Sequence, residues 1–154
     1  LAFLGDIEPP ERFAIHPVKS RLMGFKQALE EAGLSLPKAY IRSSPYTQKE
    51  SGQAAHELLS LPKPPTAIFA ASDIQALSVM KVARQLNIKI PNDLAVVGFD
   101  DIDVADHVDL TTIRQHLDES GRLAAEILLS RIGESNRPLQ HVNLSLQLID
   151  RLTT

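Results

Sequence analysis

Residues 66–115 read TAIFAASDIQALSVMKVARQLNIKIPNDLAVVGFDDIDVADHVDLTTIRQ, and this stretch decides the fold. Two short apolar runs, residues 67–71 and 94–99, are predicted to be strands, and a helical pattern lies between them. A polar pair follows each run: Ser72 and Asp73 after the first, Asp100 and Asp101 after the second. Continuous apolar runs are typical of buried parallel strands, and ligands of parallel sheets gather at the carboxyl ends of the strands. The stretch therefore predicts a parallel sheet that binds something polar.

The flanking sequence extends the alternation of strands and helices in both directions. Strands are predicted at residues 1–5, 40–42 and 95–99, and helices at 18–33, 47–61 and 73–86. A further strand at 111–115, a helix at 117–132 and two short strands at 141–144 and 147–150 follow. The β-α-β-α-β order predicts an α/β fold with a doubly wound parallel sheet and right-handed crossovers. Because Leu1 already belongs to a strand pattern, we expect the chain to begin inside a domain.

Composition narrows the classes of function. The chain has 154 residues, 44% hydrophobic and 23% charged, which is ordinary for one globular core. Its net charge of −3 argues against a surface that grips a phosphate backbone. It has no cysteine, which excludes disulfides and thiolate metal sites. No apolar run reaches the length of a membrane span, so we expect no membrane partner.

Three motifs occur in one order and spacing: Ala-Ser-Asp at 71–73, Pro-x-Asp-Leu-x-Val-x-Gly-Phe-Asp-Asp at 91–101, and Leu-Thr-Thr-x-x-Gln at 110–115. In these motifs the chain resembles the effector-binding domain of the lac-repressor (LacI/GalR) family of bacterial transcription regulators. The resemblance implies a two-lobed fold like that of type I periplasmic binding proteins. It assigns residues 1–109 to the second lobe, 110–135 to a strand and helix of the first lobe, and 136–154 to return strands. It also implies a cytoplasmic protein that reaches operator DNA only through an N-terminal helix-turn-helix absent from these residues.

The resemblance implies a ligand cleft with Arg21, Asp100 and Gln115 at its wall. Arg21 stands in SRLMGFKQAL, residues 20–29, matching a family helix whose arginine points into the cleft. A guanidinium offers rigid donors to hydroxyls or a carboxylate. The carboxylate of Asp100 could accept hydrogen bonds from neighbouring sugar hydroxyls. Gln115 is expected to reach the cleft or to bond between the lobes. The implied ligand is a small polar effector, most simply a sugar.

Three further positions complete the predicted ligand site. Tyr46 falls in the loop where relatives place an aromatic ring against the sugar, although Pro45 is an alternative alignment. Ser72 and Asp73 sit where a polar ligand contact is common. Asp73 is also a good N-cap for the helix that follows, and we expect capping to be its main role.

The resemblance also implies a two-fold homodimer. In the family, the helix after the Ala-Ser-Asp motif and the loop after Gly-Phe-Asp-Asp build the interface. Self-complementary contact is what such symmetry requires. The predicted interface residues are Gln75, Ser78, Val79, Ile102, Asp103 and Asp106.

Two alternatives from other classes remain open. One is a metal-dependent α/β enzyme that uses the acidic segment 100–109, because oxygen-rich clusters bind magnesium. The other is a periplasmic sugar-binding protein of similar fold. No glycine-rich phosphate loop, Gly-x-Ser-x-Gly elbow or zinc-spaced histidine pair supports catalysis. We therefore predict a non-enzymatic sensor without a metal or cofactor, in which effector binding shifts lobe closure and DNA affinity.

Overall fold

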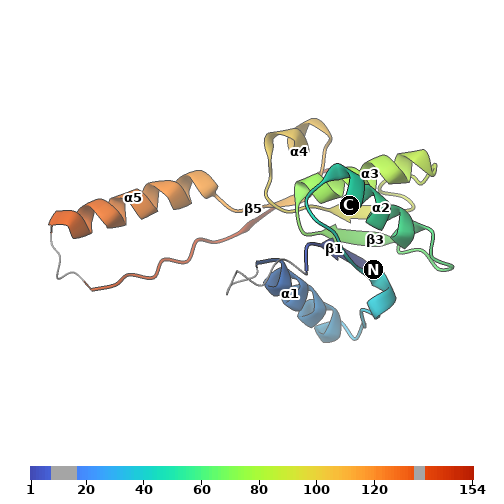
Figure 1. The fold of residues 1–154 in the computed structure, drawn as a ribbon, viewed down its shortest axis with the longest axis horizontal. Coiled ribbons are helices and arrows are strands. Elements are labelled where there is room, and N and C mark those ends of the chain that lie inside the picture. The colour runs from blue at the N-terminus through green and yellow to red at the C-terminus, as the bar shows by residue number, and fades with distance from the viewer. Residues whose placement is uncertain (8–16, 134–137) are drawn as a thin grey trace.

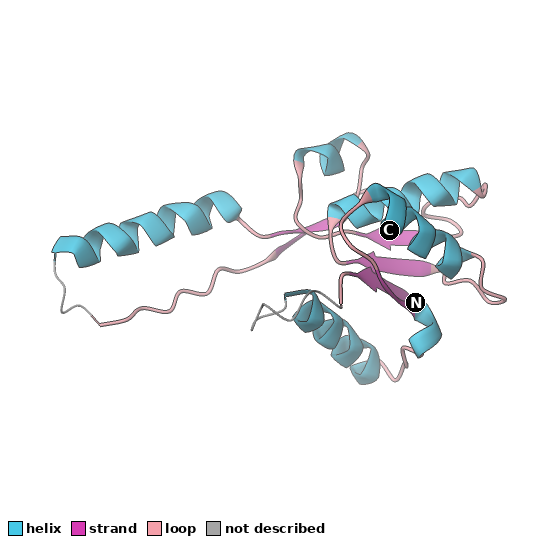
Figure 2. Cartoon of the chain, viewed as in Figure 1, coloured by secondary structure: helices cyan, strands magenta, loops and turns pink. Residues whose placement is uncertain are grey.

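The structure is a computed structural model that describes residues 1–7, 17–133 and 138–154. Its secondary structure is drawn in Figure 2. The strands are β1 (Ala2–Gly5), β2 (Ile41–Ser43), β3 (Ala67–Ala70), β4 (Ala95–Val97), β5 (Thr112–Arg114) and β6 (Gln147–Ile149). The helices are α1 (Pro17–Glu31), α2 (Gln48–Leu59), α3 (Asp73–Gln85), α4 (Asp103–His107) and α5 (Leu117–Gly133), with a 3₁₀ turn at Lys38–Tyr40.

The main sheet has four parallel strands in the order β2-β1-β3-β4. Helix α1 covers one face, and α2 and α3 lie on the other (Figure 1). This arrangement confirms the predicted α/β class and its doubly wound parallel sheet. It also brings the carboxyl ends of all four strands to one edge, which is where the polar pairs of the sequence fall.

Both faces of the sheet are packed with apolar side chains. Toward α2 and α3, the strands contribute Leu4, Ile68 and Val96, all almost fully buried. Toward α1, Phe3 and Phe69 meet edge to face with ring centroids 5.5 Å apart. A parallel sheet covered on both faces in this way needs strands that are apolar throughout, as the sequence pattern indicated.

The helices that follow β2 and β3 each begin with a side chain that caps the first turn. Thr47 caps α2 by accepting a hydrogen bond from the amide of Glu50. Ser72 caps α3 by accepting one from the amide of Gln75. The prediction that Asp73 is the cap of α3 was therefore wrong. Ser72 has the extended backbone that a capping residue needs, whereas Asp73 is already the first helical residue.

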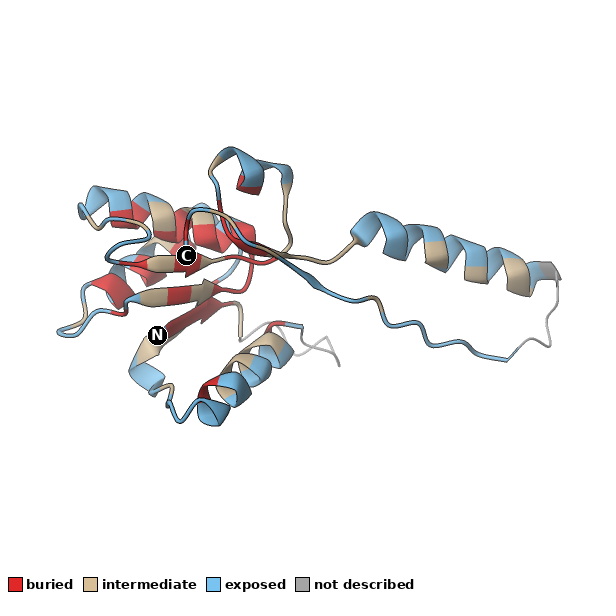
Figure 3. Ribbon diagram, turned by 180° about the vertical axis from the view of Figure 1, so that it is seen from behind, coloured by how far each residue is buried: buried red, intermediate tan, exposed pale blue. Residues whose placement is uncertain are grey.

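An arm extends from the body at one side of β4. Strands β5 and β6 pair antiparallel at its root, and α5 leads outward before residues 138–146 return (Figure 1). Figure 3 shows that the arm is mostly exposed, while buried residues concentrate in the body. The exposed apolar side chains on the arm are Leu117, Leu128, Leu129, Ile132, Leu139, Val142, Leu146 and Leu148. The arm therefore carries an apolar surface that no described residue of this chain covers.

Two local predictions near the arm were wrong. Residues 141–144 form no strand: in the described chain the antiparallel partner of β5 is Gln147–Ile149, and β5 also forms a parallel bridge from Arg114 to Asp100. The segment after Gly-Phe-Asp-Asp, expected as a loop, contains the short helix α4. The division of the chain into lobes is not tested by these observations, and residues 134 and 135 of its middle part lie outside the described residues.

Half of the predicted dimer interface is corrected by the packing of α3. Gln75, Ser78 and Val79 are at most 2% exposed within the single chain. They face the sheet and α2 rather than solvent, so they have no surface to offer a second copy. By contrast, Asp103 and Asp106 are exposed and Ile102 is half-buried. Among the described residues, no helix is both long and apolar enough to cross a membrane.

Candidate functional site

Arg21 reaches from α1 to the carboxyl ends of β3 and β4. Its Nη1 donates a hydrogen bond to the carbonyl of Ala71 at 2.8 Å. Its guanidinium carbon lies 3.7 Å from the centre of the Phe99 ring, a cation–π contact. Its Nη2 is 3.9 Å from Oδ1 of Asp100. Arg21 is thus held at the strand ends by Ala71 and Phe99, with a donor directed toward Asp100.

Asp100 stands at the end of β4 with its carboxylate between Arg21 and Gln115. Nε2 of Gln115 donates to Oδ1 of Asp100 at 2.6 Å. Burial raises the pKa of Asp100, and nearby Asp73 adds to this, so Arg21 and Gln115 offset the rise only in part. The backbone φ of Asp100 is +119°, a strained value for a residue with a side chain. A partly desolvated carboxylate held in strained backbone is a frequent property of binding sites.

Tyr46 approaches the same place from the loop after β2. Burial raises the pKa of its hydroxyl, and Asp6 and Asp100 raise it further against the opposing effect of Arg21. The charges of Arg21, Asp6 and Asp100 therefore all act on the Tyr46 hydroxyl. Tyr46 remains about half exposed. Tyr46 stays a predicted site residue, with Pro45 as the alternative alignment. Asp6, at the end of β1, was not predicted as a member.

Ser72 and Asp73 lie beneath the site rather than in it. Asp73 is buried, and its two carboxylate oxygens accept from the amide of Ile102 at 2.9 Å and the hydroxyl of Thr112 at 2.5 Å. A side chain on Gly98 would overlap this carboxylate, so glycine is required there. Ser72 is buried as well, and its hydroxyl is used within the first turn of α3. Asp73 joins α3 to the segment that follows β4 and to β5, and Ser72 fixes the first turn of α3. Both side chains are buried, so neither presents an exposed polar atom to a ligand.

Asp101 forms an ion-pair cluster beside the site. Oδ2 accepts from Nε of Arg114 at 2.6 Å, and Oδ1 accepts from Nη2 of Arg151 at 2.9 Å. Burial alone would raise the pKa of Asp101, but hydrogen bonds from the two arginines outweigh it and hold the pKa below its ordinary value. Arg151 also lies 3.3 Å from Asp106 of α4. The sequence pattern gave no sign of Arg151, which lies far from Asp101 along the chain.

The ion pairs of Asp101 bear on the alternative of a metal-dependent enzyme that uses the acidic segment 100–109. Asp101 already has a cation on each oxygen, and Asp103 and Asp106 lie on α4, exposed to solvent. Within the described ranges, no group of three acidic or histidine side chains is placed to hold a metal ion. Asp101 and Asp106 of the segment 100–109 are therefore paired with arginines.

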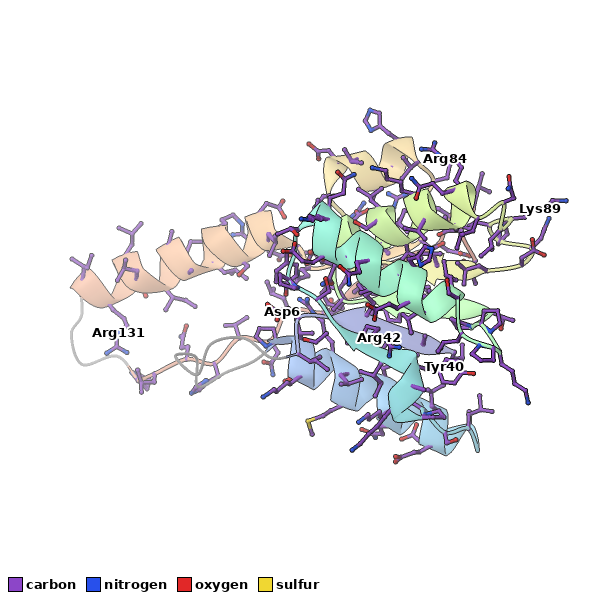
Figure 4. All side chains as sticks on the ribbon, turned by 45° about the vertical axis from the view of Figure 1, so that its right-hand side comes forward. Asp6, Tyr40, Arg42, Arg84, Lys89 and Arg131 are labelled. Atoms are coloured by element: carbon purple, nitrogen blue, oxygen red, sulfur yellow. The ribbon has the colours of Figure 1, made fainter. Side chains whose placement is uncertain are left out.

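Two hollows lie near these elements, and neither includes Asp100 or Tyr46. One, of about 510 Å³, is bordered by Arg21, Phe99 and Leu148, at the root of the arm. The other, of about 730 Å³, lies along α3 and the loop before β4. Figure 4 shows two of its lining residues, Arg84 and Lys89, on the side of the body away from Asp6. The side chains of Arg21 and Asp100 are 17% and 27% exposed, so the polar wall that they form is open to a ligand.

Comparison with known proteins matches the whole chain, residues 1–154, to the family described as periplasmic binding protein-like domain. The HTH-type transcriptional repressor CytR of Escherichia coli (strain K12) is 37% identical over 149 residues, covering 96% of this chain and 42% of CytR. The chain therefore spans less than half the length of this relative.

Solved structures of transcriptional regulators share the fold. The transcriptional regulator CelR in complex with cellobiose has a TM-score of 0.85 at 29% identity, over 99% of this chain and 46% of CelR. A LacI family transcriptional regulator from Enterococcus faecium with bound ribose has a TM-score of 0.85 at 27% identity, over 99% of this chain and 55% of that one.

These relatives are regulators of transcription, which agrees with the prediction that the chain is not an enzyme. The family model covers every residue, and the motifs at 71–73, 91–101 and 110–115 lie at the strand ends where a ligand of this fold would bind. The chain therefore belongs to the family of periplasmic binding protein-like domains, as an effector-binding domain of the LacI type.

Proposed function

We propose that this chain is the sugar-sensing and dimerising part of a cytoplasmic LacI-type repressor. The observation that carries the proposal is the meeting of Arg21, Asp100 and Gln115 at the carboxyl ends of the parallel strands. A carboxylate flanked by guanidinium and amide donors matches the alternating donors and acceptors of adjacent sugar hydroxyls. Cellobiose and ribose in the related structures support a sugar as the ligand class.

The ligand would complete its contacts against an opposing lobe. The site is an open wall here, and the apolar residues of the arm lie exposed. We propose that residues 110–135 pack into that first lobe, which would cover Leu128, Leu129 and Ile132. Effector bound between the lobes would favour their closed arrangement and so alter the affinity of the protein for operator DNA. The DNA would be contacted by a separate helix-turn-helix.

Asp100 is the residue that tests the site. In the intact regulator, we expect Asp100→Ala to weaken binding of the sugar effector about tenfold or more, because unpaired buried donors cost about 1–3 kcal/mol. Calorimetric titration against a panel of mono- and disaccharides, including ribose and cellobiose, measures this. Glu30→Gln, an exposed carboxylate elsewhere on α1, should leave affinity unchanged. Equal affinity in the Asp100 variant would remove Asp100 from the site, and absence of any sugar binding would reject the sugar.

The dimer is proposed on a corrected surface. The hollow of about 730 Å³ has an apolar lining that includes Leu77 and Met80, and Lys81 and Arg84 beside it. Helix α4 presents the exposed Val104 between Asp103 and Asp106. A two-fold arrangement would place the acidic, apolar α4 of each copy against the basic-edged hollow of the other. Ile102, Asp103 and Asp106 thus remain in the proposed interface, joined by Leu77 and Met80.

Sedimentation velocity tests this surface. Leu77→Glu should convert the dimer to a monomer without unfolding it, because a charge would enter the apolar centre of the contact. Met23→Glu, on the exposed face of α1, is the matched control and should leave the dimer intact. A Leu77→Glu protein that still sediments as a dimer would rule out this face.

A further inference from the structure

Gln75 is a polar side chain at a position where α3 packs into the core. Its side chain is fully buried, at 0% exposure. Burying an amide costs free energy unless its donors and acceptor find partners. Here Nε2 donates to the carbonyl of Ser44 at 2.8 Å, and Oε1 accepts from the hydroxyl of Ser72 at 3.3 Å. The amide is therefore used at both ends, and one of them reaches across to the loop after β2.

Ser44 is the residue through which that loop is fixed. Its amide donates to the carbonyl of Gly5 on β1 at 3.0 Å, and its carbonyl is the acceptor for Gln75. Its hydroxyl lies 3.2 Å from that of Ser51 on α2, and the Ser51 hydroxyl donates to the carbonyl of Pro45 at 3.0 Å. The segment immediately before Tyr46 is thus bonded to β1, α2 and α3 at once.

Tyr46 itself has no such attachment. Its hydroxyl makes no hydrogen bond within the part of the chain that the structure describes, and the side chain is 47% exposed. Its place at the strand ends is therefore set by the backbone at Ser44 and Pro45, which the three hydrogen-bonded elements hold. Among the three elements that hold this backbone, only α3 does so through a long side chain.

We propose that Gln75 is a positioning residue of the effector site: it holds Ser44 and thereby fixes the loop that carries Tyr46. The inference rests on the proposed function for its consequence in sugar binding, but the placement of Tyr46 can be measured without a ligand. Removal of the Gln75 amide leaves the Ser44 carbonyl buried and unpaired, and the loop relieves this by moving toward water. Tyr46 then moves with the loop and becomes more exposed to solvent.

The composition of the chain provides a direct probe. It contains two tyrosines and no tryptophan. In a Tyr40→Phe background, the fluorescence of the isolated chain comes from Tyr46 alone. We expect Gln75→Met, which keeps the side-chain volume but removes the amide, to increase quenching of this fluorescence by acrylamide. Ser78→Ala is the matched control, because the buried Ser78 hydroxyl bonds only to Ile74 of its own helix, and its quenching should equal that of the parent.

A milder variant guards against loss of the fold. Ser51→Ala removes one hydroxyl that holds Pro45 and should increase quenching in the same direction by a smaller amount. Circular dichroism confirms that each variant is folded. The proposal is overturned if folded Gln75→Met shows the same quenching as the parent. If Gln75→Met unfolds, the same result in folded Ser51→Ala overturns it.

The consequence for binding is tested by a double-mutant cycle in the intact regulator with ribose and cellobiose as probes. Gln75→Met should weaken binding by a factor similar to that of Tyr46→Ala, and should add no further loss when Tyr46 is already alanine. An equal loss in both backgrounds would show that Gln75 acts on the site by another route and would overturn the proposal. If neither sugar binds the parent protein, the proposed effector class fails, while the quenching result still decides the role of Gln75.

Discussion

Asp101 links the stability of the chain to pH. Its two arginine partners lower its pKa in the folded state below the ordinary value of an aspartate. The cluster therefore stabilises the folded state at pH values above that ordinary pKa. This contribution is lost as the pH falls through the lowered pKa. We expect Asp101→Asn to lower the free energy of unfolding at pH 7 by about 1–3 kcal/mol, because the arginines lose a charged acceptor.

Urea denaturation across pH measures this effect. The difference between parent and Asp101→Asn should be greatest at neutral pH and shrink steadily in acid, below an ordinary aspartate pKa of about 3.9. Asp118→Asn, on the exposed α5, serves as the control and should show little difference at any pH. A difference between parent and Asp101→Asn that is independent of pH would contradict the linkage.

The roles of neighbouring polar residues mark a limit of sequence reasoning at this scale. Ser72 and Asp73 are both good capping residues, and the pattern alone favoured the wrong one. The choice depended on which backbone was extended, and on the space that Gly98 leaves for the Asp73 carboxylate. Arg21 and Asp100 could be predicted because a motif carried them. Arg151 could not, because its partner Asp101 is distant in the sequence.

At the scale of elements, the first turn of α3 depends on Ser72. Ser72→Ala removes the cap and leaves the buried Gln75 oxygen without its donor. We expect a loss of about 0.5–2 kcal/mol in the free energy of unfolding, measured by chemical denaturation. Ser72→Thr should recover most of it, since threonine caps by the same contact. Equal stability of the alanine variant would show that the cap contributes nothing.

Helix α5 should be the least protected helix of the chain on its own. Within its described side chains none is buried, and isolated helices of its length are marginal in water. We expect its amides to exchange with deuterium far faster than those of α3, whose inner face is in the core. Mass spectrometry of peptic fragments makes the comparison. Slow exchange in α5 of a monomeric sample would mean that the arm folds back onto the body.

Most helices and strands could be predicted, because the spacing of apolar residues and the positions of turn residues in the sequence agree with the packing of the folded chain. Residues 141–144 were predicted as a strand, yet the antiparallel partner of β5 is β6 alone within the described residues. Helix α4 was missed because five residues give too little period to detect. Gln75 and Val79 were expected at a surface because α3 has apolar residues around much of its circumference. The sequence does not show which side of such a helix meets the sheet.

At the scale of the whole molecule, the parallel order of the strands explains why the site was foreseeable in outline. Residues far apart in sequence, such as Arg21 and Gln115, both reach Asp100. They do so because the strands of the parallel sheet end at one edge and β5 bridges in parallel to the segment after β4. What the sequence could not supply was the support beneath them. The hydrogen bond from Gln75 to Ser44 joins α3 to the loop after β2, and these two segments come into contact only in the folded chain.

Because β5 pairs with β6, the arm between these two strands could be deleted without separating the strands that flank it. Arg114 lies directly opposite Gln147 in that antiparallel ladder, so the chain leaves and returns at neighbouring points. Two residues, Asn-Gly, could therefore replace residues 115–146 as a tight hairpin turn. Closing a far shorter loop also costs less entropy. We expect the shortened protein to keep the thermal transition of the body, followed by circular dichroism, and to resist aggregation better because the exposed leucines of the arm are gone. Failure to fold would show that the body depends on the arm; success would yield a minimal unit that keeps Arg21, Asp100 and Tyr46 of the candidate site but lacks Gln115.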